Sequence, residues 1–137
     1  MIEKGNVMYI TLESDYAIRI VGCIKKENKR IDSKAISEKT GVTLRFALKI
    51  LRKLVANGII KSYKGTQGGY ELAKAPSDIS LMDIIETVEG KYYFSRCLNE
   101  DCGCNRGMSG VCQYQKIFNE ISQIVEEKLN SYTFDKF

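Results

Sequence analysis

Histidine is absent from the 137-residue sequence. Without an imidazole, the chain can have no hydrolase triad that uses histidine as its base and no zinc site with a histidine ligand. The glycine fingerprint of a nucleotide-binding enzyme is also missing. These absences argue against an enzyme, and any metal would have to be held by cysteine thiolates, carboxylates or water.

Long apolar runs are missing as well. No run reaches the roughly 18 residues of a membrane-spanning helix, and the first residues, MIEK, lack the charged and apolar regions of a signal peptide. We therefore expect a cytoplasmic protein with no membrane partner. In a reducing cytoplasm, clustered cysteines indicate a metal or redox site before they indicate structural disulfides.

The sequence has no internal repeat and no low-complexity linker, and its length suits one compact domain with an appended element. Charge is divided unevenly along it. Residues 1–76 contain 15 basic and 7 acidic residues, a net charge of +8, whereas residues 77–137 contain 6 and 10, a net charge of −4. This asymmetry predicts an anionic polymer as partner of the first half.

Residues 14–26 have apolar side chains at helical spacing, with Ser14 as a candidate N-cap. Cys23 lies among these apolar residues, so we expect it to be a small core residue. A short helix is predicted from the Asp32-Ser33 cap to Lys39.

Gly41 then breaks the chain before Thr43, which can cap a longer helix to about Asn57. Two helices joined by a tight glycine turn are typical of a helix-turn-helix. Arg45, Lys49 and Arg52 share one side of the longer helix. A separate, apolar side is predicted to face the core: Leu44, Ala47, Leu48, Leu51, Leu54 and Val55. The cationic side fits either a DNA-binding surface or an ordinary solvated surface.

A β-hairpin is predicted next, with strands at 59–63 and 70–72 and a glycine-rich turn at 64–69. Such a hairpin beside a helix-turn-helix is a wing. Lys61, Lys64 and Gln67 lie near its tip, where they could meet phosphates or a minor groove.

Two further helices are predicted. The first begins with a capping box at Ser80 and ends at Gly90, with inward side chains Leu81, Ile84, Ile85 and Val88. The second covers residues 113–132 and has an apolar stripe made of Tyr114, Phe118, Ile121, Val125, Leu129 and Tyr132. This stripe can pack on a second chain, on its own domain, or on both.

Several segments together resemble the Rrf2 family of bacterial winged-helix transcription regulators, which includes an iron-sulfur-cluster regulator, a nitric-oxide-sensing repressor and a cysteine-metabolism repressor. The resemblance extends from about Tyr9 to Gln123. The matching segments are DYAIR at 15–19, LVANGIIKSYKG at 54–65, GGYELA at 68–73, DISLMDII at 78–85 and VEG at 88–90.

The resemblance implies a mainly α fold with a small β-hairpin: a winged helix-turn-helix domain at residues 8–90, a cysteine-rich loop at 91–112, and a dimerisation helix with a tail at 113–137. It also implies a homodimer that binds double-stranded DNA at a palindromic operator. The residues that match the family's DNA contacts are Thr43, Arg45, Phe46, Lys49 and Lys64. The sequence departs from the family at Leu48, Lys49 and Thr66-Gln67, so the operator need not be the family's best-known one.

The segment CLNEDCGCNRGMSGVC at 97–112 contains four of the five cysteines. Soft thiolates on a glycine-rich loop suit an iron-sulfur cluster. Cluster-binding relatives have three cysteines here and one other ligand, and the resemblance matches Cys97 and Cys112 to the first and last positions and Cys104 to the middle one. The fourth ligand of a [2Fe-2S] or [4Fe-4S] cluster would be Cys102 or Asp15, which matches an acidic ligand of some relatives.

The cysteine loop has alternatives. A four-cysteine zinc site usually has two C-x2-C knuckles, which are absent. A thiol-disulfide switch would use thiols whose pKa is lowered by Arg96 or Arg106. An iron-sulfur electron carrier would need no cationic helix. We therefore predict a repressor, with no small-molecule substrate, that senses redox, nitric oxide or iron-sulfur status through a cluster.

Overall fold

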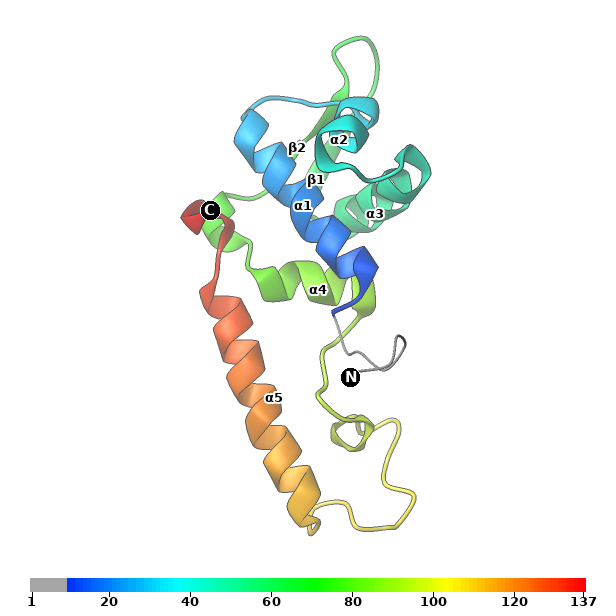
Figure 1. Ribbon diagram of the computed structural model, residues 1–137, viewed down its shortest axis with the longest axis vertical. Helices are drawn as coiled ribbons and strands as arrows, with labels where there is room; N and C mark the ends of the chain where they lie inside the picture. The colour runs from blue at the N-terminus through cyan, green and yellow to red at the C-terminus, as the bar shows by residue number, and fades with distance from the viewer. Residues whose placement is uncertain (1–9) are drawn as a thin grey trace, which may run out of the picture.

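The structure, a computed structural model, describes residues 10–137 (Figure 1). Tyr9 and the first residues of the predicted 8–90 domain lie outside this range. The described elements confirm a mainly α chain with a small β-hairpin. They are α1 (Leu12–Glu27), α2 (Ser33–Thr40), α3 (Leu44–Ala56), β1 (Ile60–Tyr63), β2 (Gly69–Leu72), α4 (Leu81–Glu89) and α5 (Gln113–Ser131), with short 3-10 turns η1 (Pro76–Asp78), η2 (Arg96–Leu98) and η3 (Phe134–Lys136).

The molecule has two parts. Helices α1 to α4 and the hairpin gather into one body, which we call the head (residues 10–90). The loop 91–112 leads away from the head, and α5 returns alongside it; residues 91–131 are called the arm (Figure 1). None of the helices in the described range is both long and apolar enough to cross a membrane.

Local capping signals account for most helix starts. Asp32 accepts a hydrogen bond from the Ala35 N–H at 2.8 Å and caps α2, as predicted. The Ser80 capping box of α4 is also confirmed. The prediction that Ser14 caps the first helix is wrong. Thr11 caps α1 by accepting from the Ser14 N–H at 3.2 Å, and Ser14 itself is buried in the first turn of the helix.

The helix-turn-helix forms as expected. Gly41 ends α2 with a φ of 73°, in the left-handed region that favours glycine, and Thr43 then caps α3. The predicted core side of α3 needs three corrections. Leu44 is 43% exposed, because it lies at the solvated first turn, while Ile50, which was left out of that side, is completely buried. Leu48 is half-buried outside the core cluster and lines a surface hollow with Arg45 and Lys49.

The wing is β1 paired antiparallel with β2, in the register Ile60↔Leu72 to Tyr63↔Gly69. An additional bridge, Ile31↔Tyr70, attaches the segment before α2 to β2. Gly69 is required at this junction. A Cβ there would lie 2.8 Å from the Ile31 carbonyl oxygen, closer than side chains approach.

The core of the head includes a residue from the C-terminal end of the chain. Phe134, after α5, is 2% exposed and belongs to the cluster of buried apolar side chains in the head. Its N–H donates to the Ile79 carbonyl at 3.0 Å, and the Leu81 N–H donates to the Tyr132 carbonyl at 2.9 Å. The predicted division at 91, 112 and 113 stays a prediction, but the tail packs on the head.

Candidate DNA-binding face and cysteine-rich loop

The cationic side of α3 is exposed. Within residues 10–137, Arg45 and Arg52 form no ion pair. Lys49 is 59% exposed, and its Nζ lies 3.9 Å from the Glu13 carboxylate, at the outer limit of an ion pair. Glu13 is engaged more closely by Lys53, whose Nζ is 2.7 Å away. The three predicted cations therefore remain available to an anionic partner.

Thr43 and Phe46, which the resemblance also assigned to DNA contact, have structural contacts in the described fold. The Thr43 hydroxyl accepts from the Phe46 N–H at 3.3 Å, which caps α3. The Phe46 ring is half-buried and meets Tyr16 edge-to-face, with centroids 5.4 Å apart. Thr43 nevertheless stays exposed, beside Arg45 and Lys49 in one surface hollow.

On the wing, Lys61, Lys64 and Gln67 are all exposed. Neither lysine forms an ion pair with another described residue. The tip therefore offers unpaired positive charge on the same part of the molecule as α3, as expected for a winged-helix reading head.

Sequence reasoning missed the support at the base of the wing. The Arg30 guanidinium lies 3.4 Å from the centroid of the Tyr63 ring and 3.7 Å from the Glu71 carboxylate. The Tyr63 hydroxyl donates to Glu71 at 2.6 Å, and this hydrogen bond raises the pKa of Tyr63. These three side chains link the segment before α2 to both strands of the wing. The bridge between Ile31 and Tyr70 could not be predicted either, because it joins residues that are far apart in the sequence.

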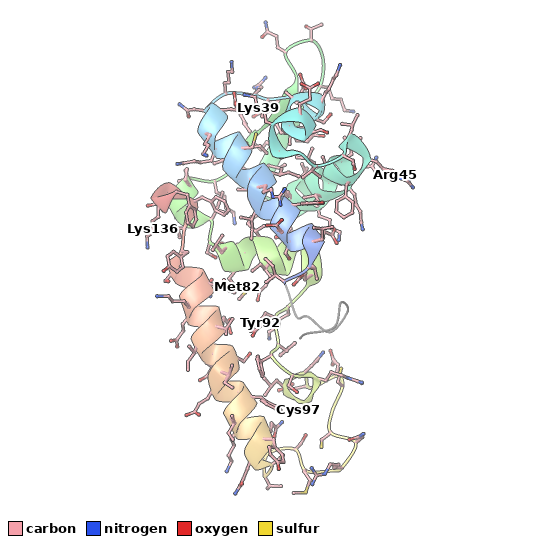
Figure 2. All side chains as sticks on the ribbon, in the orientation of Figure 1. Lys39, Arg45, Met82, Tyr92, Cys97 and Lys136 are labelled. Atoms are coloured by element: carbon pink, nitrogen blue, oxygen red, sulfur yellow. The ribbon has the colours of Figure 1, made fainter. Side chains whose placement is uncertain are left out.

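The cysteine loop lies in the arm. Figure 2 shows Cys97 there, far from Arg45 on the head. All the cysteines of the described chain are free thiols. Cys97, Cys104 and Cys112 are half-buried, whereas Cys102 is exposed.

Residues 10–137 contain no group of three Cys, Asp or Glu side chains placed to hold a metal ion. The predicted cluster ligands are thus not brought together in this conformation. Asp15, the other candidate, lies on α1 and forms an ion pair with Arg19 at 2.6 Å. Convergence of these ligands stays a prediction.

The chemistry of the donor set fits an iron-sulfur cluster. Main-chain N–H groups of Met108 and Arg106 donate to the Cys104 sulfur, and they lower the pKa of this thiol. A site that favours thiolate is what a metal ligand needs. Gly103, Gly107 and Gly110 have positive φ values of 61°, 66° and 85°, which allow tight turns between the thiols.

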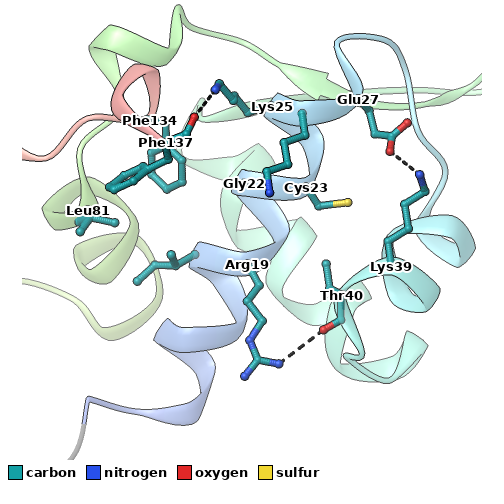
Figure 3. A pocket seen from close by; sticks show the side chains of 12 residues that line it. Arg19, Gly22, Cys23, Lys25, Glu27, Lys39, Thr40, Leu81, Phe134 and Phe137 are labelled. Atoms are coloured by element: carbon teal, nitrogen blue, oxygen red, sulfur yellow. Dashed lines mark hydrogen bonds and ion pairs between the residues drawn. The ribbon is translucent and has the colours of Figure 1, made fainter.

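Cys23 is outside this loop. It is half-buried against the head core, close to the predicted core position, and burial raises the pKa of its thiol. Its side chain faces a cavity of about 600 Å³ between α1, α2 and the C-terminal turn (Figure 3). Two of the lysines around this cavity are already engaged: Lys39 with Glu27, and Lys25 with the Phe137 main-chain oxygen. We assign it no ligand.

The apolar side chains of α5 extend beyond the predicted stripe. Phe118, Ile121, Val125 and Leu129 of the predicted stripe are half-buried against the protein's own chain. Two exposed residues beside the stripe were not predicted: Ile117, which is 50% exposed, and Ile124, which is 65% exposed. Tyr114, the first residue of the predicted stripe, is also exposed, by 64%.

Comparison with known proteins agrees with this architecture. Residues 10–137 match the model of the Rrf2 family, described as "Iron-dependent Transcriptional regulator". Protein rrf2 of Nitratidesulfovibrio vulgaris is 29% identical over 128 residues, covering 92% of this chain and 84% of that protein. The transcriptional regulator NsrR of Bacillus licheniformis is 25% identical over 129 residues, covering 92% and 89%.

The structure of CymR, described as the global cysteine regulator of B. subtilis, superposes with a TM-score of 0.76 at 23% identity, covering 94% of this chain and 95% of that one. This likeness confirms the winged-helix fold. The similar proteins are transcriptional regulators rather than enzymes. The chain belongs to the Rrf2 family of DNA-binding transcriptional regulators.

Proposed function

We propose that this regulator is a cytoplasmic, homodimeric repressor whose operator binding is controlled by an iron-sulfur cluster on the cysteine loop. One observation carries the proposal: the exposed cations of α3 and the wing lie on the head, and the four free thiols of the cysteine loop lie on the arm. This separation supports a surface for reading DNA on the head and a surface for sensing on the arm.

The DNA-binding surface would place α3 in the major groove. Arg45 and Lys49 lie toward its N-terminal end, from which recognition helices reach base edges. Arg52 on α3, with Lys61 and Lys64 on the wing, would contact phosphates, because these cations are exposed. Gln67 at the wing tip would meet the minor groove, and Thr43 with Phe46 would position the start of α3.

A second copy of the chain would cover the outer face of α5. Exposed Tyr114, Ile117 and Ile124 recur at helical spacing and form an apolar surface along the arm. Pairing through this face gives a two-fold dimer, and two heads related by two-fold symmetry match a palindromic operator.

Cys97, Cys104 and Cys112 would hold the cluster, with Cys102 or Asp15 as the fourth ligand. Bound there, a cluster supplies reversible one-electron redox chemistry and reactivity toward oxidants and nitric oxide. The chain itself supplies soft thiolate donors, and no histidine is present to replace them.

The arm can pass a change in the loop to the head. The first half of α5 holds the loop, since the Gln115 side chain donates to the Cys97 carbonyl at 2.9 Å and the Ser122 hydroxyl accepts from the Phe94 N–H at 3.3 Å. The C-terminal end of the helix is joined to α4, since the Ser80 hydroxyl donates to the Asn130 side chain at 3.2 Å. An allosteric coupling of about 1 to 3 kcal/mol along this path would change operator affinity by roughly 5-fold to 150-fold.

Anaerobic purification tests the proposal. We expect a brown protein with broad visible absorption, bound iron and sulfide, and a gel shift that changes when the cluster is removed. A colourless protein without iron would contradict cluster binding, and an unchanged gel shift would contradict regulation.

The second candidate is a regulator with a thiol-disulfide switch. The lowered pKa of the Cys104 thiol, caused by main-chain N–H groups that donate to its sulfur, supports it. In that case the protein would be colourless, and oxidation followed by mass spectrometry would identify a disulfide between loop cysteines. A zinc site would also be colourless but would yield zinc on metal analysis.

A further inference from the structure

One side chain contacts both ends of the cysteine loop. Gln115 lies in the first turn of α5 and is half-buried. Its Nε2 donates to the Cys97 carbonyl at 2.9 Å, and its Oε1 accepts from the Gly110 N–H at 2.7 Å. Cys97 begins the cysteine segment, and Gly110 lies two residues before Cys112, which ends it. The amide therefore spans the segment from one end to the other.

The other hydrogen bonds inside the segment 97–112 are local in the described structure. Asn99 accepts from the N–H groups of Cys102 and Gly103, and Met108 accepts from those of Val111 and Cys112. These bonds close separate turns at the two ends of the segment. Within the described chain, Gln115 is the residue that joins the Cys97 turn to the turn before Cys112.

Gln115 is also part of a longer attachment. Residues 115, 118 and 122 share one face of α5 because they are three and seven positions apart. Ser122 accepts from the Phe94 N–H, and the Phe118 ring lies 5.4 Å from the Phe94 ring, centroid to centroid. The segment from Phe94 to Cys97 is thus held against α5 by three contacts. The hydrogen bond from Gln115 to Cys97 is the one at its C-terminal end.

We propose that Gln115 is a positioning residue for the cysteine site: its amide holds Cys97 and the turn before Cys112 at a fixed separation, so that the two thiols have less conformational freedom to lose when they converge on a shared ligand. This inference rests on the proposed function for the identity of that ligand. Preset ligands lose less conformational freedom on binding, so the site holds its metal more tightly.

Two substitutions separate the halves of the contact. Gln115→Ala removes both hydrogen bonds while preserving helix propensity in α5. Gln115→Glu keeps an oxygen that can accept from the Gly110 N–H but removes the donor to the Cys97 carbonyl. The control is Gln123→Ala, an exposed glutamine of the same helix with no side-chain hydrogen bond to a described residue.

The first measurement is the anaerobic rate at which a chelator bleaches the visible absorption of the loaded protein. We expect bleaching about tenfold faster for Gln115→Ala, which loses two hydrogen bonds, about threefold faster for Gln115→Glu, and unchanged for Gln123→Ala. The second measurement, on cluster-free protein, is the iodoacetamide alkylation rate of Cys97 resolved by mass spectrometry. Both Gln115 variants should be alkylated faster than wild type, with unchanged helix content by circular dichroism.

The outcomes are separable. Wild-type alkylation rates in both Gln115 variants overturn the positioning role, whatever the bleaching rates. Faster alkylation with wild-type bleaching also overturns it, because Gln115 would then hold the loop without presetting a ligand. If wild-type protein binds no iron and sulfide, the proposed function fails, and alkylation alone decides whether Gln115 fixes Cys97.

Discussion

The head buries apolar side chains from each of its helices around one core, whereas in the arm, residues 91–131, Ser122 alone is buried. The head is therefore stabilised by the packing of this core, to which the tail contributes Phe134. The arm is held by individual contacts, such as the hydrogen bond from Phe94 to Ser122 and the half-buried Phe118 ring. A sensing element needs a small free-energy difference between states, and a sparsely packed arm can supply it.

The largest expected effect tests whether the tail belongs to the head. Phe134→Ala should lower the free energy of unfolding by about 3 to 5 kcal/mol, because a buried phenylalanine is replaced by a cavity. Phe137→Ala is the matched control, since the Phe137 ring contacts the Phe134 ring but is 56% exposed. Urea denaturation measures both. Equal losses would mean that Phe134 is not part of the core.

The next effect concerns the outer face of the arm. Ile124→Asp should weaken dimerisation at least tenfold, because burying an isoleucine side chain contributes about 1.5 to 3 kcal/mol and a charge opposes burial. Sedimentation over a concentration series measures it. Gln123→Asp adds the same charge at a neighbouring exposed position and should leave the dimer intact. A monomeric wild type, or an unaffected Ile124→Asp dimer, would exclude this face as the interface.

A comparable effect is expected within the reading surface. Lys49→Ala should cost about 1 to 3 kcal/mol on the operator and relax sequence preference, whereas Lys64→Ala should weaken operator and random DNA alike. Lys53, which is paired with Glu13, gives the control: Lys53→Ala should change affinity least. Fluorescence anisotropy at several salt concentrations distinguishes them. Equal loss on both DNAs for Lys49→Ala would contradict its role in base reading.

The sequence predicted the head better than the arm for a physical reason. Caps at Asp32, Thr43 and Ser80 depend on neighbours three residues away, so their signals are local. The prediction that Ser14 is the N-cap was wrong because Thr11, three residues earlier, is also a capping residue. Ser14 is instead buried against the core. Ile50 was missed because helical periodicity alone does not locate the centre of an apolar face.

The candidate sites show the same difference between features set by local sequence and features set by contacts between distant segments. Exposure of Arg45, Lys49 and Arg52 followed from the periodicity of one helix. Contacts between distant segments could not be read from spacing, such as Lys53 with Glu13 or Gln115 with Cys97. Cysteine spacing identified the donors of a metal site, but it does not define how a loop folds.

The smallest effect should come from the surface of the head, where Glu27 pairs with Lys39 and joins α1 to α2. The hydrogen bond from Lys39 holds the pKa of Glu27 below its ordinary value of about 4.5. A lowered folded-state pKa stabilises the head above the unfolded-state pKa, and this stabilisation disappears as pH falls through the folded-state pKa. Glu27→Gln should therefore melt slightly below wild type at neutral pH, and the two curves should merge in acid. Melting curves that stay apart in acid would show that Glu27 acts through packing instead of charge.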